Sequence, residues 1–323
     1  MDTSNNSSIF DSGVSTGVVS TPPRIIKRDK FPLLHLPLLA REQVFEMMTP
    51  FELIDLSLTS SRAQRAVTLF SKNKFRFSVE IELDVCPSID IKGDKRIIWR
   101  YSWTSVQSMA YQSKYDYFLQ STQKFSETPE EDCRKWYEMM IKGVLGCRIT
   151  KISVCCPNIS LIDWYRSQQD SIKKVSIFGG FQEDLKYLLT NLKVSEELVL
   201  DSCYGHNFHL EIPEGPTRLF IKTSKFINYS QLLKLTAREI NLYQSDLTNQ
   251  EINRFLKSWM ACESHLNLKN FEINVNGPEA VNEIMDLPHE KAEYDYKIKR
   301  CDGKEANIRF NMLLIPRLFL SID

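Results

Sequence analysis

The chain lacks an excess of either charge and any long apolar run. Its 323 residues include 41 basic and 41 acidic side chains, so the net charge is zero at pH 7. Because nucleic-acid-binding proteins are usually basic, we expect no nucleic-acid partner. A membrane-spanning helix needs about 18 uninterrupted apolar residues, and no segment has them, so we expect no membrane partner. Residues 1–30 also lack the apolar core of a signal peptide.

The eight cysteines lack the paired spacing of a metal site or a disulfide framework. Without a secretory context, they indicate reduced thiols and a protein of the cytoplasm, the nucleus or both. Residues 1–30 are rich in serine, threonine and asparagine, which predicts a disordered tail.

Motifs for catalysis or cofactor binding are also absent. The chain has no phosphate-binding glycine loop, no G-x-S-x-G and no H-E-x-x-H. Cys203, His206 and His209 are closely spaced, but structural zinc usually has four such ligands. We therefore expect no catalytic residue, no metal and no cofactor, and a chain that is not an enzyme. A hydrolase or transferase rests only on scattered histidines and cysteines and is the weakest hypothesis.

What the sequence does contain is an apolar helical segment at residues 31–72. A Leu-Pro pair opens it, and helical spacing continues to about Met48. Thr49 and Glu52 form a capping box for a second helix, and Ser60 can cap a third. A unit of roughly 40 residues buries too little of its own surface to be comfortably stable alone. It either lies on the rest of the chain or binds another protein.

This segment resembles an F-box, and its run PFELIDLSLTSSR is similar to those of the large nematode F-box families. The resemblance implies that residues 31–72 bind a small Skp-type adaptor and, through it, a cullin. It implies that the following residues form or support the adaptor-binding face: Leu36, Pro37, Val44, Met48, Pro50, Leu53, Leu56 and Leu58. Thr59 and Ala63 differ from the residues common at these places in the family. A protein-interaction scaffold that does not ubiquitinate is therefore the alternative function.

The next segment, residues 73–145, predicts a β-hairpin and a connecting helix. Residues 75–83 alternate between apolar and polar side chains, and residues 96–103 read as a second strand. Thr128 and Glu131 repeat the capping-box pattern, which predicts a helix to the end of the segment.

Residues 146–323 contain a repeating pattern of short strands. Six apolar i, i+2 pairs begin 23, 23, 21, 21 and 33 residues apart: Ile152 and Val154, Val175 and Ile177, Leu198 and Leu200, Leu219 and Ile221, Ile240 and Leu242, Ile273 and Val275. One strand and one crossing per ~20–29 residues is typical of a leucine-rich-repeat-like solenoid. The expected fold is α+β, with a three-helix unit before an irregular α/β solenoid and flanking β-hairpins. An open mixed sheet with crossover helices is the competing architecture.

A closing hairpin is predicted at residues 294–314, because Asp302-Gly303 is a strong turn signal. With the runs LTNQEINRFLKSWM and YKIKRCDGKEANIRF, residues 145–312 resemble the type 2 F-box-associated domain of nematode F-box proteins. The resemblance implies a domain that binds a protein substrate.

Strand alternation turns the neighbours of the buried residues toward the opposite face. Concave solenoid faces are common binding surfaces, which makes this face the candidate substrate site. The residues predicted there are Lys174, Glu197, Asp201, Arg218, Phe220, Lys222, Asn241 and Tyr243. We therefore expect a non-catalytic substrate-recognition subunit of a cullin-based ubiquitin ligase. The sequence does not identify its protein substrate.

Overall fold

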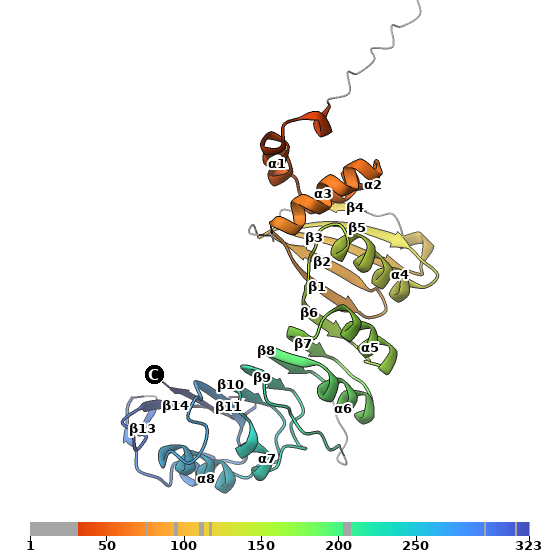
Figure 1. Ribbon diagram of the computed structural model, residues 1–323. Coiled ribbons are helices and arrows are strands. Elements are labelled where there is room, and N and C mark those ends of the chain that lie inside the picture. The colour runs from red at the N-terminus through yellow and green to blue at the C-terminus, as the bar shows by residue number, and fades with distance from the viewer. Residues whose placement is uncertain are drawn as a thin grey trace, which may run out of the picture.

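Over the residues that it describes, the computed structural model shows a curved α/β molecule built on a mixed sheet of 15 strands (Figure 1). It describes residues 32–74, 76–93, 96–109, 113–115, 118–202, 208–293, 295–313 and 315–322. The tail predicted at residues 1–30 lies outside the described residues, as do Cys203 and His206.

Three α-helices precede the sheet, as the sequence predicts. After a 3-10 turn, η1 (Leu33–His35), they are α1 (Leu38–Met47), α2 (Pro50–Leu58) and α3 (Ser61–Asn73). The capping box of α2 is confirmed, because Thr49 Oγ1 accepts the Glu52 N–H at 3.2 Å and the Glu52 carboxylate accepts the Thr49 N–H at 2.7 Å. The Ser60 hydroxyl caps α3 by accepting the Ala63 N–H at 3.2 Å.

These helices are anchored to the sheet and share its hydrophobic core. Phe45 of α1 packs edge-on against Phe70 of α3, with ring centroids 5.4 Å apart. Phe51 of α2 contacts Tyr101 of the sheet at 4.5 Å. The Arg76 guanidinium donates to the Phe45 carbonyl oxygen at 2.8 Å, at the end of α1. The N-terminal unit therefore lies on its own chain.

The strands that follow form one end of the sheet. They are β1 (Ser78–Leu83), β2 (Ser88–Lys92), β3 (Ile98–Thr104), β4 (Ser113–Tyr115) and β5 (Leu119–Phe125), with a 3-10 turn, η2 (Gln107–Met109), after β3. Strands β1, β2 and β3 are antiparallel neighbours, whereas β3 and β5 are parallel. Strands β1 and β3 correspond to the two that the sequence predicts, but they do not form a hairpin with each other, because β2 lies between them and pairs with both.

The predicted helix after residue 128 is present but begins differently. It comprises α4 (Pro129–Trp136) and a π-helical continuation, η3 (Tyr137–Lys142). The predicted capping box is wrong, because the Thr128 side chain makes no capping hydrogen bond. Instead, the Ser126 hydroxyl accepts the Thr128 N–H at 3.0 Å and donates to Asp132 at 2.7 Å. A serine outside the expected motif organises this helix start.

Six parallel strands match the period found in the sequence. They are β6 (Ile149–Val154), β7 (Ser171–Ile177), β8 (Lys193–Leu200), β9 (Arg218–Ile221), β10 (Glu239–Leu242) and β11 (Asn270–Asn274). They pair in chain order, and β6 also pairs in parallel with β1. The connecting helices are α5 (Ile159–Gln168), α6 (Gln182–Asn191), α7 (Tyr229–Lys234) and α8 (Asn249–Met260). The arrangement is an open mixed sheet with crossover helices.

The core of this array lies between the strands and helices α5–α8, which follow the outer side of the curve in Figure 1. The capping box predicted at Thr248 and Glu251 is present and starts α8. It sets the helix so that Phe255 and Trp259 are fully buried, and Phe255 packs on Phe271 of β11 at 4.7 Å.

The described part of the C-terminal region contains a short helix and two strands, β12 and β15, that the sequence analysis missed. Its elements are α9 (Ala280–Ile284), β12 (Glu290–Lys291), β13 (Tyr296–Lys299), β14 (Glu305–Asn311) and β15 (Arg317–Ile322). The predicted hairpin of β13 and β14 is present, with Gly303 at φ +95° in its turn. Strand β15 pairs with β11 on one side and β14 on the other. The parallel array is therefore closed by β15, and the hairpin lies beyond it.

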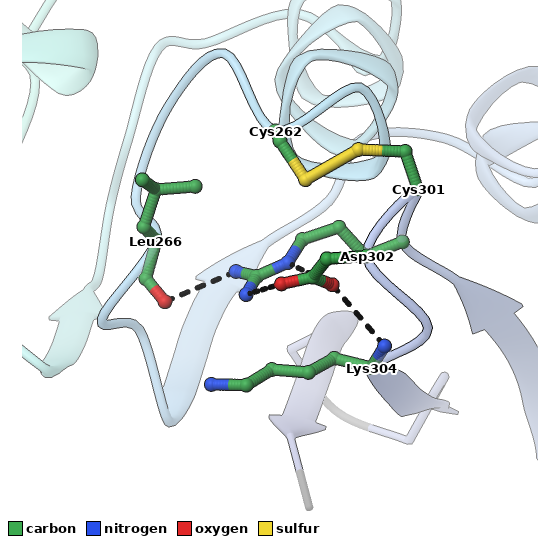
Figure 2. Close-up of a disulfide and its surroundings, with 6 residues drawn as sticks. Cys262, Leu266, Cys301, Asp302 and Lys304 are labelled. Carbon is green, nitrogen blue, oxygen red and sulfur yellow. Dashed lines mark hydrogen bonds and ion pairs between the residues drawn. A yellow bond between two sulfur atoms is a disulfide. The ribbon is translucent and has the colours of Figure 1, made fainter.

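A disulfide joins this hairpin to α8. Cys262, just after α8, is bonded to Cys301 in the β13–β14 turn, with Cα atoms 6.3 Å apart (Figure 2). The expectation that the cysteines are reduced is wrong for this pair, because the fold brings together two residues 39 positions apart. Next to the bond, the buried Arg300 guanidinium pairs with Asp302 and donates to the Leu266 carbonyl oxygen at 3.0 Å.

Removing the disulfide is expected to destabilise the protein. Because the bond closes a loop of 39 residues in the unfolded chain, Cys301→Ser should lower the free energy of unfolding by about 4 kcal/mol at 25 °C. Urea unfolding of the oxidised protein measures this difference. Cys86→Ser removes an exposed free thiol and serves as the control. An equal loss in both variants, or none in Cys301→Ser, contradicts the expectation.

His265 is expected to make stability depend on pH. Burial lowers the pKa of His265 to about 4, and its ring packs edge-on against Phe255 at 4.9 Å. Since the unfolded chain binds the proton more tightly, stability should fall as pH decreases from about 6.5 to about 4, by on the order of 3 kcal/mol.

His265→Asn tests this pH dependence, because asparagine does not titrate in this range and tolerates the left-handed backbone, φ +52°, at this position. Urea unfolding near the two ends of the range should show a smaller loss in the variant than in the wild type. Equal losses would mean that His265 does not contribute.

Candidate functional site

The candidate substrate site is the sheet face opposite helices α5–α8, called here the concave face because it lines the inner side of the curve (Figure 1). All eight residues predicted for it lie on β7–β10 or directly after one of these strands. None is buried in the core. The alternate residues, such as Leu198 and Leu219, are buried on the helix side.

The charged residues of the concave face neutralise one another. Glu197 lies between Lys174 and Arg218 in register, and its carboxylate is 3.6 Å from the lysine Nζ and 2.9 Å from the arginine. Asp201 directly follows β8, and its carboxylate is 2.7 Å from the Nζ of Lys222, which directly follows β9. Such partly exposed pairs typically stabilise a fold by only about 0–1 kcal/mol each. They therefore remain able to exchange partners with a bound protein.

Two aromatic residues form the centre of this face. Phe220 and Tyr243 pack edge-to-face with ring centroids 5.1 Å apart. The Arg317 guanidinium of β15 lies 4.4 Å from the Tyr243 ring centroid and 3.1 Å from the Glu272 carboxylate. Partial burial, followed by the hydrogen bond to Glu272, raises the pKa of Tyr243. Asn241 lies between Phe220 and Glu272 in register.

Arg317 and Glu272 are members of this site that the predicted set omits. Glu272 is on β11, whose alternation does point it outward, so the sequence contains a signal for it. Arg317 could not be found in that way because β15 was not predicted. Aromatic residues with an arginine are the groups that most often anchor protein interfaces, so this cluster is suited to binding a protein.

Acidic, histidine and cysteine side chains are the possible metal ligands and nucleophiles among the described residues. Among them, no group of three or more histidine, cysteine, aspartate or glutamate side chains is placed to hold a metal. Of the candidate metal ligands only His209 is described, and its backbone N–H donates to Gln182. Burial raises the pKa of Cys133, and it raises the pKa of Cys147 to about 12, so both remain thiols near neutral pH.

The predicted adaptor-binding residues divide into supporting and exposed positions. Pro50 and Leu53 are buried, so they support α2 rather than contact a partner. Pro37 and Leu58 are exposed, and the partly buried members are Leu36, Val44, Met48 and Leu56.

Four more exposed apolar side chains of this unit were not predicted: Leu38, Leu39, Met47 and Leu69. Helical spacing cannot identify them, because α1 has apolar residues on more than one side and only the tertiary packing selects the buried ones.

A family model described as F-box associated matches residues 207–273. The match covers β9, β10 and most of β11, and contains five of the predicted substrate-binding residues: Arg218, Phe220, Lys222, Asn241 and Tyr243. It supports an F-box-associated domain in this part of the chain. It does not extend to residues 31–72. No curated protein and no solved structure matched the chain.

A final observation concerns membranes. In the part of the chain that the structure describes, no helix combines the length and the apolar character that crossing a bilayer requires.

Substitutions on the two faces of β8 should lower the free energy of unfolding by very different amounts. Glu197→Gln removes one half-exposed ion-pair partner and should change the free energy of unfolding by about 1 kcal/mol or less. Leu198→Ala, on the buried side, should cost about 2–5 kcal/mol. Urea unfolding compares the two variants. A similar cost for both would mean that the charged row maintains the fold and is not available for binding.

Proposed function

We propose that this chain is the substrate-recognition subunit of a cullin-based ubiquitin ligase. Its N-terminal helices bind a Skp-type adaptor, and its concave face holds a protein substrate. The observation that carries the proposal is the F-box-associated match at residues 207–273, downstream of a three-helix unit with exposed apolar side chains. In this proposal, the strand-and-crossover units of the open sheet present the concave binding face that the sequence analysis expects of a leucine-rich-repeat-like solenoid.

Support for adaptor binding comes from the apolar surface that remains after the helices have docked on the sheet. Phe45 and Phe51 already provide the contacts within the chain. Leu39 is nevertheless 75% exposed and Met47 is 77% exposed. Fully burying one such side chain contributes about 1.5–3 kcal/mol, so several together can hold a partner.

The proposed mechanism is tethering. Binding the adaptor and the substrate on one chain raises the effective concentration of the substrate near a ubiquitin carrier held by the cullin. This chain contributes no bond-breaking residue. Because α3 leads directly into β1, and β1 pairs with β6, a continuous sheet connects the two binding surfaces. The proposal places the protein in the cytoplasm or the nucleus, where adaptor and cullin would meet it, although a disulfide such as Cys262–Cys301 is uncommon in these compartments.

Adaptor binding can be tested with the full chain and purified Skp-type adaptor. The wild type should be retained in a pull-down, and the double variant Leu39→Asp, Leu58→Asp should lose at least about tenfold in affinity, because two apolar contacts become buried charges. Leu313→Asp changes an equally exposed leucine far along the chain and should bind normally.

No binding by folded wild-type protein would refute the proposed function. If the adaptor binds but no cullin is recruited, the non-ubiquitinating scaffold becomes the better description.

A further inference from the structure

A second apolar surface lies where β1, β6 and β7 end. Val85 is 84% exposed and Phe181 is 82% exposed. Together with three other exposed side chains they form what is called here the Phe181 patch: Val85, Cys156, Ile159, Phe178 and Phe181. The proposed adaptor surface is on the N-terminal helices, so the Phe181 patch is a separate feature of the molecule.

Backbone contacts bring the three strand ends together. The Cys155 N–H donates to the Leu83 carbonyl oxygen at 3.3 Å, and the Phe178 N–H donates to the Val154 carbonyl oxygen at 2.9 Å. The residues that follow β1, β6 and β7 therefore start from neighbouring positions at one edge of the sheet. The patch is formed by three loops that are remote in sequence.

Two glycines hold the Phe178–Phe181 turn closely against its neighbour. A Cβ atom on Gly179 would lie 2.7 Å from the Cys155 carbonyl oxygen, and one on Gly180 would lie 2.9 Å from Pro157. Gly180 also has a backbone angle φ of +116°, which residues with a side chain rarely adopt. Phe181 then serves as the N-cap residue of α6. Phe178 and Phe181 are therefore held on a closely packed turn, so this part of the backbone loses little conformational entropy when a partner binds.

Acidic side chains accompany this patch. Glu82 and Asp84 belong to the end of β1, and Glu183 and Asp184 to the first turn of α6. None of the four forms an ion pair with a described residue, whereas the carboxylates of the concave face at Glu197 and Asp201 do. The helix dipole favours the two acids of α6. Asp84 follows β1, where its carboxylate accepts the Val85 N–H at 2.6 Å, and Glu82 is close enough to Arg100 to help raise the pKa of that guanidinium.

We infer that the Phe181 patch binds a segment of a partner protein in which bulky apolar side chains are flanked by lysine or arginine. The phenylalanines bury the apolar side chains, and the carboxylates of Asp84, Glu183 and Asp184, which form no ion pair with a described residue, attract the flanking cations. The Asp201 N–H donates to the Ile177 carbonyl oxygen at 2.8 Å, so the patch adjoins the concave face. Identifying this segment as part of the substrate rests on the proposed function, but the binding chemistry does not.

The experiment uses the full chain and a fluorescein-labelled peptide with a central Leu-Phe pair flanked by lysines. Fluorescence anisotropy should show binding that weakens by at least about tenfold in Phe178→Ser, Phe181→Ser. Glu183→Lys, Asp184→Lys should weaken it too. Binding should also decrease as salt rises from about 0.05 M to about 0.5 M, because exposed charges are screened. Met139→Ser removes an exposed apolar side chain elsewhere and should bind like the wild type.

Two peptide controls separate the contributions. Replacing the flanking lysines with glutamates, or the Leu-Phe pair with serines, should abolish binding. The inference is overturned if the glutamate peptide binds equally well, or if the phenylalanine variant binds normally. It is also overturned if the wild type forms a dimer that the phenylalanine variant does not, since a second copy would then cover the patch.

These outcomes are distinguishable from failure of the proposed function. A chain that binds the adaptor but not the lysine-flanked peptide refutes only this inference. A chain that binds the peptide through Phe178 and Phe181 but does not bind the adaptor refutes the ligase role and leaves the patch as a protein-binding site.

Discussion

The parallel pairing of β1 with β6 is the contact on which the arrangement of this protein depends. It places Ile81 beside Ile152 and is reinforced by the Thr150 hydroxyl, which donates to the Val79 carbonyl oxygen at 2.9 Å. The paired residues are far apart in sequence, so the pairing joins the N-terminal helices and the repeating strands into one sheet. Without it, the two proposed binding surfaces would be connected only through the segment that contains α4 and η3.

Helices on one side of the parallel strands determine how the other side is used. Leu198 of β8 and Trp259 of α8 are both fully buried, because the apolar side chains of the strands and of the helices form one hydrophobic core. The concave face, on the opposite side of the strands, is not part of this core and carries paired charges around Phe220 and Tyr243. The carboxyl ends of β1, β6 and β7 instead carry exposed apolar side chains close to acidic residues, which gives the molecule a second surface of different chemistry.

Local features were predicted well because their interactions are local. The capping boxes at Thr49 and Thr248 involve residues three positions apart, and both are present. The six repeating strands follow from alternation over a few residues each. Thr128 shows the limit of this reasoning, because a competing hydrogen bond from Ser126, just outside the motif, organises that helix start. The Phe181 turn was visible only as a pair of glycines after a strand.

By itself, the sequence determined many of the helices and strands, among them α2, α8 and the six strands β6–β11, the apolar face of each, and that a three-helix unit precedes a repeating one. Tertiary structure decided which leucines of α1 stay exposed, that β15 closes the array, and that Cys262 meets Cys301. The physical reason is the sequence distance over which each kind of interaction acts. Caps and alternation depend on neighbours a few residues away, whereas burial, strand order and disulfide pairing depend on contacts between segments that only the complete fold brings together.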